Sequence, residues 1–151
     1  SCYGYGMTLS ALQIAQAYSV FANQGNFIEL NLFKENSFAE SLNERVINVD
    51  TNQKIVDMLV STVNSQGGTA SKAKLSKWIV AGKTGTAKET VEAETTYTAT
   101  FAGFVPHDSP EFLAVVVLHG LAGDDYSGGK VSAPLFSSIM EQIFLLRDLE
   151  I

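Results

Sequence analysis

The stretch Trp78-Ile79-Val80-Ala81-Gly82-Lys83-Thr84-Gly85-Thr86-Ala87 decides how this chain is interpreted. It begins with apolar residues typical of a strand and passes into a polar tetrad, Lys83 to Thr86, that contains one glycine. Side chains alternate between the two faces of a strand, so Lys83 lies on one face and Thr84 and Thr86 lie on the other. These three side chains can therefore serve one site only along the edge of the strand.

The tetrad has the chemistry to bind a carboxylate-bearing substrate that undergoes acyl transfer. Lys83 supplies positive charge, while Thr84 and Thr86 supply O–H donors. Gly85 allows another backbone to approach closely. A free strand edge offers N–H groups to a peptide-like substrate, and the Thr86 N–H can help to stabilise a developing oxyanion. The alternative is a strand end with an ordinary turn glycine, but the position after an apolar strand favours a functional site.

Composition describes a folded domain and excludes several classes of function. The 151 residues are 46% apolar and 17% charged, which is enough for one domain with a real core. The formal charge of −6 argues against nucleic-acid binding and against attachment to a membrane through basic residues. The single cysteine, Cys2, excludes an internal disulfide, and no Cys/His spacing indicates zinc, so we expect no cofactor.

The chain carries no recognisable targeting segment. No run is apolar over the roughly 18 to 20 residues that a transmembrane helix needs, and no secretory leader is visible. Because the sequence starts at Ser1 without an initiator Met, we expect it to be a piece of a longer protein.

Capping patterns and periodicity predict two helices in the first half of the chain. Ser10 and Gln13 have capping-box spacing, and the helix that follows should be mostly buried and end at Gly25. A second helix should begin at a cap formed by residues 50–53 and stop at residues 66–68. Its inward side chains should be those of Ile55, Met58 and Leu59.

Three strands are expected to follow, over residues 78–87, 97–105 and 112–118. Residues 88–96 are polar and charged, which predicts a connection between the first two strands. The last strand is an unbroken apolar run, typical of a strand that is buried on both faces. Connections this short imply an antiparallel meander.

A final helix should lie across this sheet. Ser132 should cap it, and Pro134 fits its first turn. Its apolar stripe consists of Phe136, Ile139, Met140, Ile143 and Phe144. The predicted class is therefore α+β, with helices packed on an antiparallel sheet.

Several blocks of the sequence together resemble one known family. Lys83-Thr84-Gly85 is one part of the three-part signature of penicillin-binding proteins and class A β-lactamases. The further blocks are Gly4-Tyr5-Gly6 with Ala11-Leu12-Gln13-Ile14-Ala15-Gln16-Ala17-Tyr18, Gly67-Gly68-Thr69-Ala70, Phe101-Ala102-Gly103-Phe104-Val105-Pro106 and Gly128-Gly129-Lys130-Val131-Ser132-Ala133-Pro134. They resemble class B penicillin-binding proteins, in the order of that family and over nearly the whole chain.

The resemblance implies that residues 1–151 are the C-terminal portion of a single transpeptidase domain of the septal or elongation type. The N-terminal half of that domain, which carries the nucleophile, is expected to be absent from this chain. The implied fold is penicillin-binding or serine β-lactamase-like, with five strands in the complete domain and three of them here.

The resemblance also implies a bacterial peptidoglycan D,D-transpeptidase for cell-wall synthesis and cell division, on the periplasmic side of the cytoplasmic membrane. A membrane anchor would lie outside this chain. The family serine attacks D-Ala-D-Ala stem peptides, and β-lactam antibiotics acylate the same serine. By motif, Lys83 would bond the serine of the family's Ser-x-Asn element. The hydroxyls of Thr84 and Thr86 would bind the terminal carboxylate, and the Thr86 amide would complete the oxyanion hole.

Two positions depart from the family pattern. Ala11 stands where proline is usual, and Tyr126-Ser127 stands where relatives often carry two aromatics. Tyr97 and Tyr126 are candidates to line the substrate cleft. The alternative, that they are loop aromatics that close the sheet, carries equal weight.

The family's nucleophilic Ser-x-x-Lys and its Ser-x-Asn have no convincing copy here. Ser71 and Ser127 each begin a Ser-x-x-Lys, and Ser41-Leu42-Asn43 spells Ser-x-Asn, but these copies lie at the wrong places in the family order. We therefore predict that residues 1–151 alone are inactive and do not react with penicillin. The strand over residues 112–118 should have a bare apolar edge, which favours aggregation unless another segment completes the sheet.

Two other functions share parts of this pattern. A serine β-lactamase or D,D-carboxypeptidase has the same tetrad, and a non-catalytic β-lactam sensor has the same fold. His119 with Asp124 and Asp125 matches no recognised metal-site spacing, and His107 is expected in a surface turn.

Overall fold

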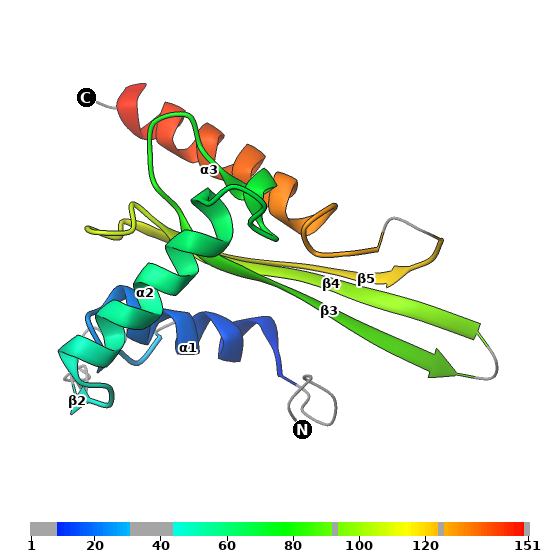
Figure 1. Ribbon diagram of the computed structural model, residues 1–151, viewed down its shortest axis with the longest axis horizontal. Helices are drawn as coiled ribbons and strands as arrows, with labels where there is room; N and C mark the ends of the chain where they lie inside the picture. The colour runs from blue at the N-terminus through cyan, green and yellow to red at the C-terminus, as the bar shows by residue number, and fades with distance from the viewer. Residues whose placement is uncertain (1–8, 31–43, 92–93, 124–125, 150–151) are drawn as a thin grey trace, which may run out of the picture.

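The computed structural model describes residues 9–30, 44–91, 94–123 and 126–149, shown in Figure 1. Its α-helices are α1 (Ala11–Ala22), α2 (Val49–Asn64) and α3 (Ser132–Leu149). The main sheet consists of β3 (Ala81–Val91), β4 (Glu94–Val105) and β5 (Phe112–Leu121). The smaller elements are the strand pair β1 (Asn26–Phe27) and β2 (Glu44–Arg45) and the 3-10 helix η1 (Ser71–Ala73). This arrangement confirms the predicted α+β class.

The main sheet is an antiparallel meander in the order β3-β4-β5, as its short connections predict. Gly82 on β3 lies opposite Gly103 on β4, and Phe101 on β4 lies opposite Val116 on β5. Figure 1 shows α3 across one face of the sheet and α1 along the other. The tetrad Lys83 to Thr86 therefore lies in an outer strand of the described sheet, which has helices on both faces.

The hairpin formed by β3 and β4 is longer than the sequence predicts. Residues 88–96, expected to be a polar connection, continue the pairing as far as Val91 opposite Glu94. The hydroxyls of Thr90 and Thr95 lie 3.2 Å apart across the two strands. Threonine favours strands, and threonine pairs across strands stabilise hairpins, so these polar residues extend the strands and do not end them.

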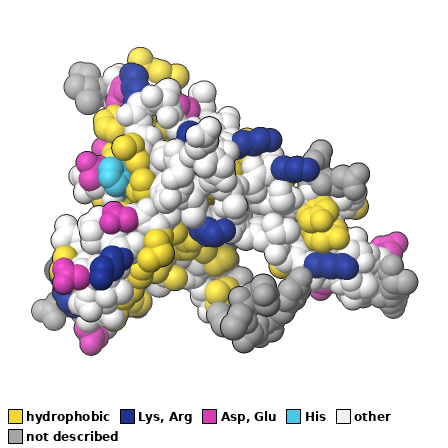
Figure 2. Space-filling view, in the orientation of Figure 1, with side chains coloured by type: hydrophobic (Ala, Val, Ile, Leu, Met, Phe, Trp, Pro, Cys, Tyr) yellow, Lys and Arg dark blue, Asp and Glu magenta, His cyan; other side chains and the backbone are white. Residues whose placement is uncertain are grey.

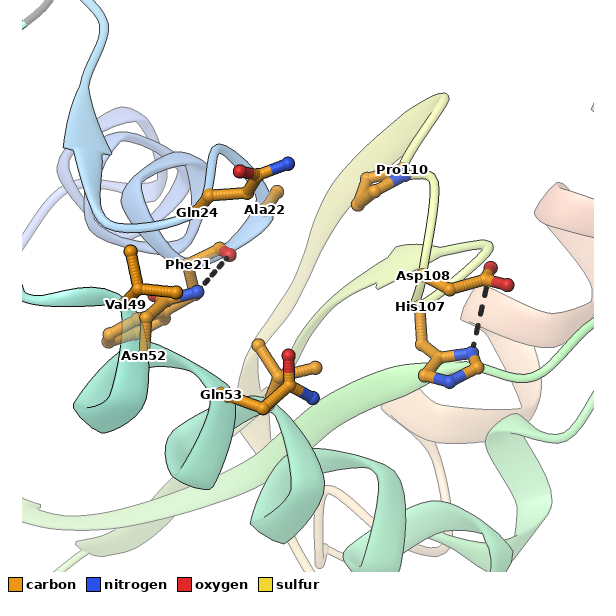
Figure 3. A pocket seen from close by; sticks show the side chains of 10 residues that line it. Phe21, Ala22, Gln24, Val49, Asn52, Gln53, His107, Asp108 and Pro110 are labelled. Atoms are coloured by element: carbon orange, nitrogen blue, oxygen red, sulfur yellow. Dashed lines mark hydrogen bonds and ion pairs between the residues drawn. The ribbon is translucent and has the colours of Figure 1, made fainter.

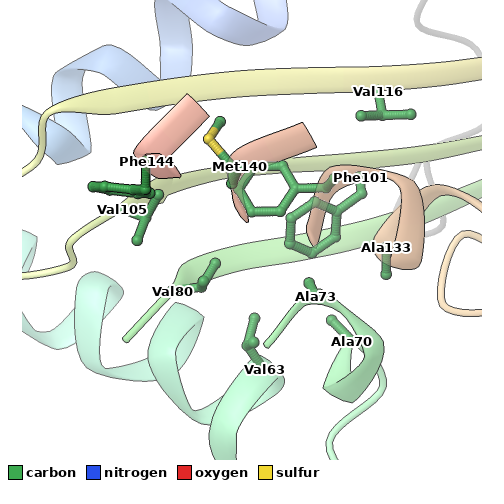
Figure 4. Packing of buried hydrophobic residues seen from close by; sticks show 11 residues of the cluster. Val63, Ala70, Ala73, Val80, Phe101, Val105, Val116, Ala133, Met140 and Phe144 are labelled. Atoms are coloured by element: carbon green, nitrogen blue, oxygen red, sulfur yellow. The ribbon is translucent and has the colours of Figure 1, made fainter. Parts of the chain in front are cut away.

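The main hydrophobic core lies between the sheet and α3 (Figure 4). Phe101 packs against Phe136 of α3, with ring centroids 4.7 Å apart. Trp78 stacks on Phe144 near the end of the same helix, at 5.2 Å. The residues of this core with no exposed area are Val63, Ala70, Ala73, Val80, Phe101, Val105, Ala133 and Phe136. Most of the predicted stripe of α3 thus faces a closed core.

Helix α3 differs from the prediction at its first residue and on one side of its stripe. Ser132 is the first helical residue and is buried, and its hydroxyl has no hydrogen-bond partner among the described residues. It is therefore not the expected cap. The Gly128 carbonyl instead accepts from the amides of Ser132 and Ala133, which lie at the beginning of the helix and have no acceptor within it. Within the stripe, Met140 is buried whereas Ile139 is 39% exposed.

A smaller hydrophobic cluster lies on the opposite face, between the sheet and the helices α1 and α2. Phe104 is fully buried there against Val56 and Leu59 of α2. The prediction that α1 is mostly buried is wrong, because Val20 is its one buried residue. Met58 of α2, expected to point inward, is 63% exposed because it lies beside the stripe at positions 52, 56, 59 and 63 that faces the core. Figure 2 shows apolar side chains at the surface around these helices.

Local signals predict the ends of α1 correctly and the start of α2 less well. The Gln13 amide donates to the Ser10 hydroxyl at 3.2 Å, and the Ser10 amide donates to the Gln13 side chain at 2.9 Å, which confirms the capping box. Gly25, with a φ of 86°, lies just beyond the end of this helix. The second helix begins earlier than predicted, because the Asn48 side chain accepts from the Thr51 amide at 2.8 Å and acts as the cap.

Strand β5 is less buried than its apolar sequence predicts. Val116 is its one buried residue, and the others are half-buried or exposed. Helices α1 and α3 contact the strand, but within the described residues it pairs with β4 alone. As far as the described residues show, its outer edge is free, as predicted for this strand.

Candidate active site

The tetrad Lys83 to Thr86 lies within β3, at an outer edge of the sheet. Within the described residues β3 pairs with β4 alone, so its other edge is open. Lys83 and Thr86 are exposed, and Thr84 is half-buried. The polar groups of this segment are therefore accessible to a ligand that approaches along the strand.

The backbone of β3 presents hydrogen-bonding groups at this open edge. The Thr62 hydroxyl of α2 donates to the Gly82 carbonyl, so that carbonyl points away from β4. In an antiparallel strand, the backbone groups of alternate residues point to the same edge. The N–H and C=O groups of Thr84 and Thr86 therefore also face the open edge, where an added strand can pair with them.

Lys83 and Thr84 meet at this edge although their side chains leave opposite faces of the strand. The Lys83 ammonium Nζ donates to the Thr84 carbonyl at 3.1 Å and to the Thr84 hydroxyl Oγ1 at 3.3 Å. In the described part of the chain, Lys83 forms no ion pair. Its positive charge thus attracts an anionic ligand to the edge of the strand.

Thr86 is held by a residue far away in the sequence. Its hydroxyl oxygen accepts a hydrogen bond from the Gly128 amide at 3.1 Å. A threonine hydroxyl has one proton to donate and two lone pairs that accept. Because the Thr86 oxygen accepts from Gly128 and the Thr84 oxygen accepts from Lys83, each hydroxyl keeps its proton for an incoming acceptor. A carboxylate accepts such bonds strongly.

The two glycines near the tetrad are there for different reasons. A Cβ at Gly82 would lie 2.5 Å from the ring atom Cζ of Phe101 and 2.8 Å from the Ala102 carbonyl oxygen, so packing inside this chain requires glycine there. A Cβ at Gly85 would meet only the Cβ of Thr100, at an ordinary 3.7 Å. Packing among the described residues therefore does not require Gly85, and its missing side chain leaves space beside Lys83, which shares its face.

Tyr97 and Tyr126, the two aromatic candidates, stack on each other with ring centroids 3.6 Å apart and planes inclined by 9°. Both residues are half-buried. Tyr97 lies opposite Lys88, which follows the tetrad along β3. The stack covers one face of each ring, and this contact fits either role, closing the end of the sheet or lining a cleft.

Ser71 and Ser127, which are not expected to be nucleophiles, lie in connecting segments, as the sequence predicts. Ser71 is exposed and begins the short helix η1, not a buried helix. Ser127 is half-buried in the loop before α3, where its carbonyl accepts from the backbone amide of Lys130. The other candidate motif, Ser41-Leu42-Asn43, lies outside the described residues, as do Gly4-Tyr5-Gly6 and Cys2.

The histidines have ordinary partners. His119 Nδ1 lies 3.0 Å from the Thr98 hydroxyl, and His107 Nδ1 lies 3.8 Å from the Asp108 carboxylate. Within the described residues, no group of three or more His, Cys, Asp or Glu side chains is arranged to hold a metal ion. The described helices likewise include none that is long and apolar enough to span a membrane. Asp124 and Asp125 lie outside the described part.

A cavity of about 260 Å³ lies near the β4–β5 turn, between the end of α1 and the start of α2 (Figure 3). Asn52 is buried beside it and donates to the Phe21 carbonyl at 3.1 Å. Among the described residues, the Asn52 oxygen Oδ1 has no partner. No residue of the tetrad lines this cavity, so it is separate from the candidate active site.

Sequence reasoning missed the residues that hold the tetrad in place. Asn64 of α2 donates to the Val80 carbonyl at 2.9 Å, and Thr62 donates to Gly82 in the same way. Gly128 belongs to a block that resembles the family, but no role followed from that block. The spacing of Thr62, Asn64 and Gly128 from the tetrad carries no local pattern, so no sequence signal identifies these contacts.

Comparison with known proteins places the chain in a family. The model of the penicillin binding protein transpeptidase domain matches residues 1–141. The chain belongs to this transpeptidase family, which confirms the predicted resemblance.

The chain resembles several peptidoglycan D,D-transpeptidases. It is 33% identical over 141 residues to the probable peptidoglycan D,D-transpeptidase PenA of Neisseria flavescens, with 91% of this chain and 34% of the relative covered. It is 32% identical over 151 residues to the peptidoglycan D,D-transpeptidase FtsI of Escherichia coli, with 98% of this chain and 25% of the relative covered. The chain thus spans about a quarter to a third of the length of these curated relatives.

A solved structure supports the same fold. The transpeptidase (TP) domain of Burkholderia pseudomallei penicillin-binding protein 3 matches with a TM-score of 0.80 and 33% identity. The match covers 99% of this chain and 45% of that chain. The α+β fold is therefore that of a penicillin-binding transpeptidase domain.

Proposed function

We propose that residues 1–151 are the C-terminal portion of the transpeptidase domain of a peptidoglycan D,D-transpeptidase. In this proposal the chain supplies one wall of the acyl-transfer site, formed by Lys83, Thr84, Gly85 and Thr86. The observation that supports it most is the open edge of β3, where one ammonium and two hydroxyl donors lie beside backbone groups that pair with no other strand among the described residues. Family membership supports the same chemistry.

The proposed reaction is acyl transfer through a serine. A stem peptide lies along β3 as an added strand, and its terminal D-Ala carboxylate accepts from the hydroxyls of Thr84 and Thr86. A serine of the missing segment attacks the D-Ala-D-Ala carbonyl, and the Thr86 N–H stabilises the oxyanion. The C–N bond breaks, D-Ala leaves with a proton, and an amine of a second stem peptide then displaces the serine. A β-lactam reacts at the first step in place of the stem peptide.

Lys83 contributes charge to this reaction. Its ammonium is bonded to Thr84 and would also reach the serine of a Ser-x-Asn element carried by the missing segment. A cation in a site that excludes water stabilises negative charge more than it does in bulk solvent. Gly85 leaves the space beside it clear, and Tyr97 and Tyr126 would border the substrate farther along the hairpin.

The chain alone is proposed to be inactive, because no described serine has the setting of the family nucleophile. The missing N-terminal part of the domain would supply that serine and cover the free edge of β5. It would also cover the apolar side chains that α3 exposes, which are Leu135, Ile139, Leu145, Leu146 and Leu149. The complete protein would be a β-lactam target on the periplasmic side of the bacterial membrane, with its anchor in a segment outside this chain.

Labelling by a fluorescent penicillin tests this proposal. The full-length gene product and residues 1–151 are each incubated with the label, and adducts are located by intact and fragment mass. We expect an adduct on the full-length protein, outside residues 1–151, and none on the isolated chain. An adduct on Ser71 or Ser127 of the isolated chain would overturn the proposed division of the site.

A matched pair of lysine variants tests the tetrad itself. In the full-length protein, Lys83→Met should slow acylation by about 100-fold or more, whereas Lys88→Met, on the same strand, should leave it within about threefold. Equal rates for both variants would remove Lys83 from the site. Transfer of a D-alanyl donor to an added amine distinguishes a transpeptidase from a sensor, which acylates and does not transfer.

A further inference from the structure

Gly128 connects the candidate active site to the start of α3 through its own backbone. Its amide donates to the Thr86 hydroxyl at 3.1 Å. Its carbonyl accepts from the Ser132 amide at 3.1 Å and from the Ala133 amide at 2.8 Å. The backbone of Gly128 therefore pairs with two free amides at the beginning of α3 and with the hydroxyl of Thr86 in the tetrad.

The position has no room for a side chain. A Cβ at Gly128 would lie 2.5 Å from the Thr100 carbonyl oxygen, 2.7 Å from the Gly85 carbonyl oxygen and 3.2 Å from the Thr84 Cβ. Two of these neighbours are backbone atoms of the paired strands β3 and β4, which cannot yield as a flexible side chain can. Gly128 is buried, and its backbone therefore lies directly against the sheet beside the tetrad. Only glycine allows this approach.

This contact controls which way the Thr86 hydroxyl can donate. Without the Gly128 amide, a threonine hydroxyl rotates and can spend its proton on any nearby acceptor. With the amide bonded to one lone pair, the proton must point away from Gly128. Because Thr86 is exposed at the open edge of β3, the proton is then available to a ligand there.

We infer that Gly128 is a positioning residue, which orients the Thr86 hydroxyl as a donor to the substrate carboxylate. The inference rests on the proposed function, since it needs a carboxylate-bearing acyl donor at β3. Gly128 does not itself touch that substrate. Its effect is on selectivity for the acyl donor. Because the Gly128 amide occupies one lone pair of the Thr86 oxygen, the hydroxyl proton is directed to the substrate, and donors that end in a free carboxylate are preferred.

The test uses the full-length protein and two acyl donors that differ only at the carboxylate. One is a D-alanyl thioester that ends in a free carboxylate, and the other is its methyl ester. The kcat/KM for acylation is measured with both. Because the added Cβ also displaces the strand backbone, both rates should fall, but we expect Gly128→Ala to lower kcat/KM for the carboxylate donor by about 10- to 100-fold more than for the ester. Equal losses for the two donors would overturn the inference, because they would mean a structural role alone.

Thr86 variants link the effect to the hydroxyl. Thr86→Val should lose the same preference for the carboxylate donor, and Thr86→Ser should retain it. Adding Gly128→Ala to Thr86→Val should lower the preference for the carboxylate donor no further, because residues that act through one contact are not additive. Additive losses of this preference would contradict the inference.

A third measurement covers the case in which Gly128→Ala does not fold. Replacing the Gly128 N–H with an ester oxygen, by incorporation of the hydroxy acid, removes the donor without adding any atom to the crowded position. We expect the same selective loss with the carboxylate donor, and an unchanged preference would overturn the inference. An unmodified protein that reacts with neither donor would instead refute the proposed function, so the two failures are distinguishable.

Discussion

The two faces of the sheet are closed to different degrees. On the face covered by α3, residues such as Val80, Phe101 and Phe136 have no exposed area. On the face covered by α1 and α2, Phe104 is equally buried, but α1 contributes one buried residue, and apolar side chains lie at the surface around it (Figure 2). The chain therefore completes one hydrophobic core and leaves the other shallow.

This difference has a counterpart in the tetrad. Thr84 and Thr86 lie on the face of β3 that belongs to the closed core, and the Gly128 segment packs against them there. Lys83 and Gly85 lie on the opposite face, where a Cβ at Gly85 would meet almost nothing. The Thr86 hydroxyl is thus bonded to the Gly128 segment, while the face that carries Lys83 is exposed.

The largest expected effect on stability comes from truncating one fully buried phenylalanine on each face of the sheet, Phe101 or Phe104. In the complete domain, Phe101→Ala should reduce the free energy of unfolding by about 3–5 kcal/mol, because its cavity is walled by buried neighbours that cannot collapse. Phe104→Ala should cost less, since half-exposed neighbours such as Tyr18 and Phe21 can shift into the space. Urea unfolding of both variants measures the difference. An equal or larger loss for Phe104→Ala would show that the second face is as well packed as the first.

A smaller effect on stability is expected at the end of α3, where Arg147 forms ion pairs and packs on an aromatic ring. Arg147 lies 2.6 Å from Glu111 and 2.7 Å from Asp148, and hydrogen bonds to Glu111 and then Asp148 raise its pKa. Its guanidinium also lies over the Phe144 ring, at 4.6 Å. Arg147→Met should lower the Tm slightly at low salt and hardly at high salt, because salt screens exposed ion pairs and methionine keeps the packing. A drop that is independent of salt would assign the effect to packing.

The smallest effect concerns Tyr18 on the shallow face. Burial raises the pKa of its phenol above the ordinary value of 10.0, because the folded state disfavours the charged form. The folded-state pKa is then higher than the unfolded one, so this contribution to stability is complete below about pH 10 and is lost as the pH rises through the raised value. Tyr18→Phe should remove that part of the alkaline loss of stability. Unfolding free energies from about pH 9 to 11 would show it, and identical slopes for both proteins would refute it.

Local patterns predicted the parts of the fold that depend on neighbours in the chain. The capping box of Ser10 and Gln13 formed because its two hydrogen bonds span only three residues. The same local reasoning failed for residues 88–96, whose polar composition indicated a connection. Thr90 and Thr95 belong to paired strands instead, because their stability comes from partners across the hairpin and not from their own hydropathy.

In the candidate site, too, some features follow from local sequence and others depend on tertiary contacts. The kinds of donor in the tetrad, and the faces on which they lie, follow from residue types and from the alternation of a strand, both of which are local properties. The free edge of β3, the contact of Lys83 with Thr84 and the bond from Gly128 to Thr86 depend on how strands, loops and side chains meet in space. Gly128 is far from Thr86 along the chain, and only the packing of α3 onto the sheet brings its amide there. Tertiary structure alone sets such contacts, because hydrogen bonding depends on distance and direction in space and not on separation in sequence.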